Sequence, residues 1–130
     1  MRTGSSRESK PPSDQWHLPD VLSVQAAKVR YPQPRLYYVG TRPVLAQEAV
    51  EILVRTDGPF PARTLSPAVF VGDIPILTYE TVESNVYRFM AYDSTGLKEG
   101  AAISLGWPQF PERRITTRFV YRLGGPGLVS

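Results

Sequence analysis

The sequence predicts an all-β protein, an immunoglobulin-like antiparallel β-sandwich of seven to eight strands. Proline makes up 13 of the 130 residues, about twice its usual share of roughly 5%, and it is scattered evenly. Because proline is excluded from helix interiors, this scatter disfavours a helical bundle. Runs of β-branched and aromatic residues alternate with turn residues at intervals of roughly 8 to 12, as in sandwiches.

The central stretch, from Thr64 to Trp107, predicts four of these strands. The first run stops at Gly72-Asp73, a tight-turn pair. Each run is rich in residues that favour strands. The four expected strands are 69–71, 74–77, 86–92 and 101–107. The residues expected to face inward in the last two are Tyr87, Phe89, Ala91, Ile103, Leu105 and Trp107.

The residues before this stretch predict three strands. Val21 to Tyr31 fits either an irregular strand or a short helix, and we favour the strand. Pro32 and Pro34 should break it, so that Arg35 to Val39 forms a separate short strand. Gln47 to Arg55 shows clear alternation, with Val50, Ile52 and Val54 on one face. Asp57-Gly58-Pro59 then predicts a turn.

Arg114 to Leu123 predicts the last strand. Its alternation places Arg118 and Arg122 on the outer face. The residues expected to face inward are Ile115, Thr117, Phe119, Tyr121 and Leu123.

These strands form one domain, at 21–123. The polar, proline-containing residues 1–20 predict a disordered N-terminal arm, and 124–130 a flexible C-terminal tail. Trp16, His17 and Leu18 interrupt the polarity of that arm. They fit either an anchor that packs on the domain edge or a short docking motif in which Trp16 contacts a partner.

Part of the chain resembles the IPT/TIG-type immunoglobulin-like (E-set) modules. Ser66 to Ile76 (SPAVFVGDIPI) is similar to their strand, turn and paired strand, and GLKEGAAISL places Leu97 and Gly100 at matching positions. The sequence departs from the pattern at Glu99, where these modules have proline, and it lacks their Gly-x-x-Phe. The resemblance implies a sandwich that serves in binding, spacing or assembly.

Composition excludes several kinds of chemistry. With no cysteine, the chain has neither disulfides nor thiolate metal sites. His17 is the only histidine, which excludes a histidine-based triad or a histidine-rich metal site. The carboxylates follow no calcium-loop motif and the glycines no phosphate-loop motif. We therefore expect no catalytic residues, no metal and no cofactor.

The sequence also has no apolar signal-peptide core and no run of about 18 apolar residues. We expect a soluble, cytoplasmic protein without a membrane span, although export by another route stays open. The net charge of +3 is weak evidence for a polyanion ligand, because nucleic-acid-binding proteins usually carry clustered basic residues. We therefore do not expect nucleic acid as a partner.

The prediction for function is a non-enzymatic protein-binding or assembly module, docking through a sheet face or edge and the N-terminal arm. Adjacent strand residues point to opposite faces, so one of Tyr37 and Tyr38 should be exposed. Arg118 and Arg122 form either a solvated face or a patch for an acidic partner. The candidate partner-binding residues are Trp16, Tyr37, Tyr38, Arg118 and Arg122.

Three other readings stay open. A homo-oligomer is compatible with the same surfaces. A carbohydrate-binding module would use exposed aromatics, with Tyr37, Tyr38, Phe60 and Phe110 as candidates. An accessory subunit of an enzyme is the third.

Overall fold

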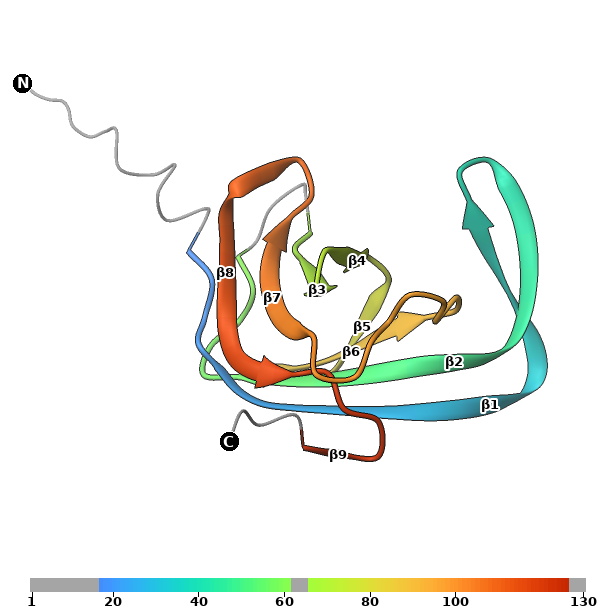
Figure 1. The fold of residues 1–130 in the computed structure, drawn as a ribbon, viewed down its shortest axis with the longest axis horizontal. Helices are drawn as coiled ribbons and strands as arrows, with labels where there is room; N and C mark the ends of the chain where they lie inside the picture. The colour runs from blue at the N-terminus through green and yellow to red at the C-terminus, as the bar shows by residue number, and fades with distance from the viewer. Residues whose placement is uncertain (1–16, 62–65, 127–130) are drawn as a thin grey trace, which may run out of the picture.

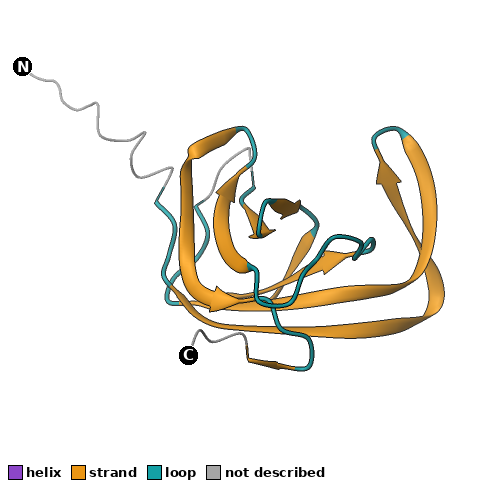
Figure 2. Ribbon diagram, viewed as in Figure 1, coloured by secondary structure: helices purple, strands orange, loops and turns teal. Residues whose placement is uncertain are grey.

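The computed structural model describes residues 17–61 and 66–126. This part of the chain contains nine strands and no helix, arranged in two antiparallel sheets (Figures 1 and 2). One sheet has the order β5-β6-β2-β1-β9 and the other β4-β3-β7-β8. The all-β sandwich predicted from the sequence is confirmed. The strands are β1 (Val21–Val39), β2 (Arg42–Thr56), β3 (Ala68–Val71), β4 (Ile74–Ile76), β5 (Tyr79–Glu83), β6 (Val86–Ala91), β7 (Ala102–Trp107), β8 (Phe110–Val120) and β9 (Gly125–Pro126).

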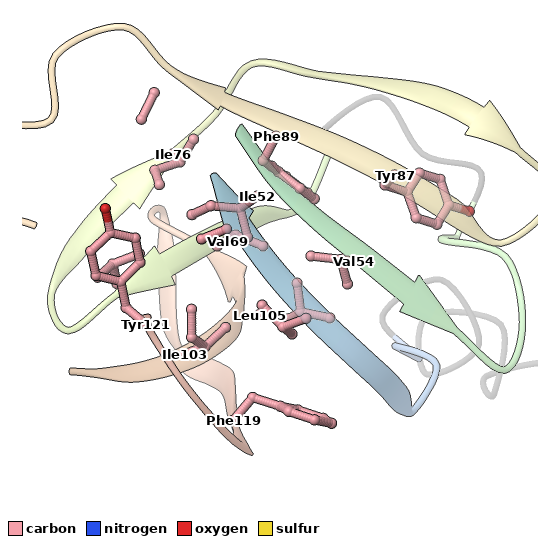
Figure 3. Packing of buried hydrophobic residues seen from close by; sticks show 14 of the residues in the cluster. Ile52, Val54, Val69, Ile76, Tyr87, Phe89, Ile103, Leu105, Phe119 and Tyr121 are labelled. Carbon is pink, nitrogen blue, oxygen red and sulfur yellow. The ribbon is translucent and has the colours of Figure 1, made fainter. Parts of the chain in front are cut away.

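The core lies between the two sheets and is entirely apolar in its centre. Val50, Ile52 and Val54 of β2 are each at most 1% exposed, which confirms the alternation read from the sequence. Side chains of β3 and β7, such as Val69 and Leu105, meet them from the second sheet (Figure 3). The six residues predicted to face inward in β6 and β7 are all buried.

Turn residues end the strands where the sequence predicted. β3 and β4 are joined by Gly72-Asp73, and Gly72 has a φ of 62°, a left-handed conformation that glycine adopts without steric cost. β2 ends at Thr56, whose hydroxyl donates to the carbonyl of Gly58 at 2.6 Å. The next residue, Asp57, forms two hydrogen bonds with Asp20 and so joins this turn to the residues just before β1.

Two predicted strands are one in the structure. Val21–Val39 forms the single strand β1, so the predicted break at Pro32 and Pro34 is wrong. Between Arg30 and Arg35 the register with β2 shifts, and β1 carries the extra residues. A bulge of this kind accommodates proline without ending the strand.

The sequence missed β5, because Tyr79–Glu83 is mostly polar. It is an edge strand with four of its five residues exposed. Such a strand buries few side chains, so its sequence shows no apolar pattern. β2 also begins earlier than predicted, at Arg42, and β8 begins at Phe110 despite Pro111. Edge positions such as those of β8 tolerate proline because one side of the strand has no partner.

The predicted inward face of the last strand is partly wrong. Phe119 and Tyr121 are buried, but Ile115 is 52% and Leu123 42% exposed. Register shifts between β7 and β8 interrupt the simple alternation. β8 ends at Val120, so Leu123 and Arg122 lie beyond the strand.

Candidate functional site

The first two strands form a hairpin that extends beyond the sandwich. β2 pairs with β6 only from Val50 to Arg55, so residues 29–49 pair only with one another. We call these residues the hairpin arm. In Figure 1 the hairpin runs past the ends of the other strands and then bends, leaving its tip apart from the sandwich.

The bulge in β1 coincides with this bend. Four β1 residues, 31–34, stand opposite the single β2 residue Gln47. A bulge of this kind leaves backbone groups without ladder partners. The Gln47 amide donates to the carbonyl oxygens of Tyr31 at 3.1 Å and of Pro32 at 3.4 Å, and so replaces part of the lost pairing.

A cluster of aromatic and charged side chains fixes the arm to the sandwich. The Tyr31 hydroxyl donates to Glu51 at 2.8 Å, and the Arg35 guanidinium lies 3.8 Å from the centre of the Tyr31 ring. Tyr37 stacks on Tyr92, with ring centres 5.1 Å apart. We call these five residues the elbow cluster. Burial, and then the hydrogen bond to Glu51, raise the pKa of Tyr31 to about 12.

The outer half of the arm exposes apolar side chains. Leu36 is 55%, Tyr38 63% and Leu45 67% exposed. Leu36 and Leu45 are directly opposite each other in the register, and Tyr38 follows Leu36 by two residues, so all three share one face. Single exposed apolar residues are ordinary, but a group on one face marks an interaction surface.

Leu36 and Tyr38 also line a groove between the arm and the sandwich. Its volume is about 490 Å³. The opposite wall includes Leu77, which is 60% exposed, and Leu97, which packs against the core. We call this the arm groove. The residues that line it are Leu36, Tyr37, Tyr38, Ile74, Pro75, Ile76, Leu77, Thr78, Met90, Ala91, Tyr92, Asp93 and Leu97.

The arm is basic as well as apolar. The hairpin arm carries the basic residues Arg30, Arg35 and Arg42 against one acidic residue, Glu48, and Lys28 directly precedes it. Arg30 pairs with Glu48 at 3.0 Å, and Arg35 lies on Tyr31. Lys28 and Arg42 form no ion pair with any residue that the structure describes.

Two of the predicted site residues, the sequence neighbours Tyr37 and Tyr38, lie in the hairpin arm. Tyr38 is exposed and Tyr37 half-buried against Tyr92, so the prediction that one of the two is exposed is confirmed. Both line the arm groove. Trp16 lies outside the described residues.

The predicted pair of arginines on one strand face is wrong, because only Arg118 lies in β8. Arg118 is exposed, with its guanidinium 5.3 Å from the centre of the Phe119 ring. It lines a second groove, of about 350 Å³, with Leu18, Leu22 and Ile115. This groove is separate in its lining from the arm groove.

The aromatics proposed for carbohydrate binding do not form one strip. Phe60 stacks on Tyr87 with ring centres 3.8 Å apart and packs against the core. Phe110 also packs against the core. Of these four side chains, Tyr37, Phe60 and Phe110 are half-buried and only Tyr38 is exposed.

Sequence reasoning missed Leu36, Leu45 and Leu77 as site residues. A signal for the arm was present: RLYYV and RPVLA flank the pair Gly40-Thr41, and two β-prone runs separated by two turn residues predict a hairpin. Gly40 has a φ of 63°, as such a turn requires. No sequence signal shows that the hairpin leaves the sandwich.

Within the described residues, no group of three or more histidine, cysteine, aspartate or glutamate residues is placed to hold a metal ion. The same residues include no helix of the length and apolarity needed to span a membrane. Comparison of the chain with protein-family models, curated proteins and solved structures gave no significant match.

Proposed function

We propose that this chain is a non-enzymatic protein-binding or assembly module of a larger complex, with the hairpin arm and the arm groove as its docking surface. The observation that carries the proposal is the set of exposed apolar residues around the groove, Leu36 and Tyr38 on the arm and Leu77 just after β4. Burying such a patch is the main favourable term in protein association.

The contacts at the base of the hairpin arm support the same function. A two-stranded hairpin is marginally stable alone, but the stack of Tyr37 on Tyr92 and the hydrogen bond from Tyr31 to Glu51 hold this one against the sandwich. Because the groove is already formed, a partner need not offset the entropy of ordering it.

We extend the proposal to the fold family, an immunoglobulin-like module of the IPT/TIG type. Leu97 packs against the core, and Gly100 has a φ of 87°, which agrees with a leucine plug followed by a glycine bend. Modules that this chain resembles usually serve in binding or assembly.

The test is capture from a lysate of the source cells, with the full chain immobilised. The double variant Leu36→Asp/Tyr38→Asp should lose the proteins that the natural chain retains, because a charge in each position opposes burial. Leu22→Asp, at an exposed leucine of the second groove, is the matched control and should retain them.

A captured protein is then purified and its Kd measured for all three chains. Loss of one central contact residue costs about 2 kcal/mol or more, roughly thirty-fold in Kd. If the double variant binds as tightly as the natural chain, the arm groove is not the docking surface.

A further inference from the structure

We propose that the free edge of β1 in the hairpin arm receives an extended, acidic segment of the partner protein as an additional strand. This inference rests on the proposed function and names the chemistry of the partner.

The outer edge of β1 has no strand beside it along the arm. β9 pairs with β1 only at Gln25, and an isolated bridge joins Ala26 to Leu123. Within the described residues, no strand pairs with this edge beyond Ala26. Unpaired edges bind extended segments through main-chain hydrogen bonds.

The register shows which backbone groups point outward. Pro43 has no N–H, and it lies opposite Tyr38. Proline is accommodated where a strand does not donate to its neighbour, so Tyr38 and Pro43 form a non-hydrogen-bonded pair. The alternation of antiparallel pairs then directs the N–H and C=O groups of Leu36 and Tyr38 to the free edge.

Other edges of the two sheets carry features that oppose strand addition. β4 has Pro75 among its three residues, and β5 has a register shift between Thr81 and Glu83. β8 has two register shifts and is rich in arginine. Bulges, prolines and charges of this kind protect edges. From Arg35 to Val39, β1 has no proline and no register shift.

The positive charge of the arm favours an acidic segment as the added strand. Lys28, just before the arm, and Arg42, beside its turn, have no ion-pair partner within the described residues, and the one acidic residue of the arm, Glu48, is paired with Arg30. An acidic segment complements this surface. The exposed leucines Leu36 and Leu45 favour a protein segment over a nucleic acid, whose backbone offers no apolar surface to bury.

The two faces of the arm specify a pattern. Leu36 and Tyr38 lie on one face, and Arg35 and Tyr37 on the other. Side chains of an added strand alternate in the same way. The occupant should therefore carry apolar residues on the side of Leu36 and Tyr38, and acidic residues on the side of Arg35.

The experiment is a selection of short random peptides displayed on phage against the immobilised full chain. Peptides that alternate apolar and acidic residues should be enriched. Their affinity is then measured by fluorescence anisotropy. Lys28→Glu/Arg42→Glu should weaken binding at least roughly tenfold.

Leu36→Pro removes one outward N–H from the edge and should abolish binding, while Leu36→Ala, which keeps that N–H, is the control for the lost side chain. Unchanged circular dichroism shows that each variant has folded. If Leu36→Pro does not fold, a peptide with N-methylated backbone on its bonding edge replaces it and should fail to bind.

Enrichment of basic or patternless peptides, or of none, would overturn the strand-addition proposal. So would equally tight binding of oligothymidine that Leu36→Pro leaves unchanged, because the arm would then be a general polyanion surface. A partner protein that is lost with Leu36→Asp/Tyr38→Asp but keeps its affinity for the Lys28→Glu/Arg42→Glu and Leu36→Pro chains would uphold the proposed function and refute the acidic strand.

Discussion

At the scale of single residues, Tyr31 links the arm to the sandwich through a group that titrates. Its phenol is neutral when it donates to Glu51, and its pKa is raised to about 12. A pKa above the unfolded value of about 10 means that Tyr31 stabilises the folded chain fully below pH 10. This contribution is lost as the pH rises through 12.

We therefore predict that Tyr31→Phe removes the highest-pH step from the absorbance titration of the tyrosines at alkaline pH. The difference between the natural chain and the variant should have its midpoint near pH 12. A midpoint near the ordinary value of about 10 would show that Tyr31 neither is buried nor donates to Glu51.

Gly106 is the second residue whose role follows from geometry. A Cβ at this position would lie 2.8 Å from the Cα of Arg114, where the pairing of β8 with β7 shifts register between Leu105 and Trp107. Backbone cannot rotate away as a side chain can, so Gly106→Ala should destabilise the fold by about 1–3 kcal/mol. Denaturant unfolding measures this.

Gly58→Ala is the control for Gly106→Ala, because its Cβ would meet only Pro19, at an ordinary 3.8 Å. Gly58→Ala should be close to neutral. Equal costs for the two substitutions would contradict the close approach of β8.

At the scale of elements, the hairpin arm depends on its contacts at the base. Two strands alone are marginally stable, and the arm lacks the third strand that β6 provides from Val50 onward. We predict that amides of residues 35–46 exchange with solvent faster than those of 50–55, as native-state hydrogen exchange would show. Equal protection would mean that the arm unfolds only with the whole sandwich.

The stack of Tyr37 on Tyr92 provides a sharper test of the same element. Tyr37→Ala should accelerate exchange across the arm without changing exchange in β7, because the lost contact lies at the elbow. Tyr38→Ala, one residue away but 63% exposed, should leave exchange unchanged. An identical effect of both substitutions would show that the elbow cluster does not fix the arm.

The elements also show what the sequence could predict. Alternation identified β2, where burial on one face imposes a period of two, and runs of β-prone residues bounded by turn residues identified β6 and β7, which are buried on both faces. Both signals failed for β5, which has little apolar surface, and at the bulge after Arg30, where Pro32 and Pro34 suggested a break. Tyr37 and Tyr38 were predicted as site residues, but Leu36 and Leu77 were not, since their exposure depends on where the hairpin bends.

At the scale of the whole molecule, the core extends toward the N-terminus further than composition suggests. Leu18, which the sequence assigns to the N-terminal arm, is 5% exposed and belongs to the core cluster. The hydrogen bonds between Asp20 and Asp57 hold this segment beside the turn after β2.

Leu18→Ala should therefore cost about 2–5 kcal/mol in the free energy of unfolding, since it deletes buried methyl groups and leaves a cavity. Leu22→Ala, at a leucine that is 49% exposed in the same segment, should cost less than about 1 kcal/mol. Denaturant unfolding of the two variants compares them directly. If Leu18→Ala were as mild as Leu22→Ala, the sandwich would close without Leu18, and the cooperative unit would begin at β1.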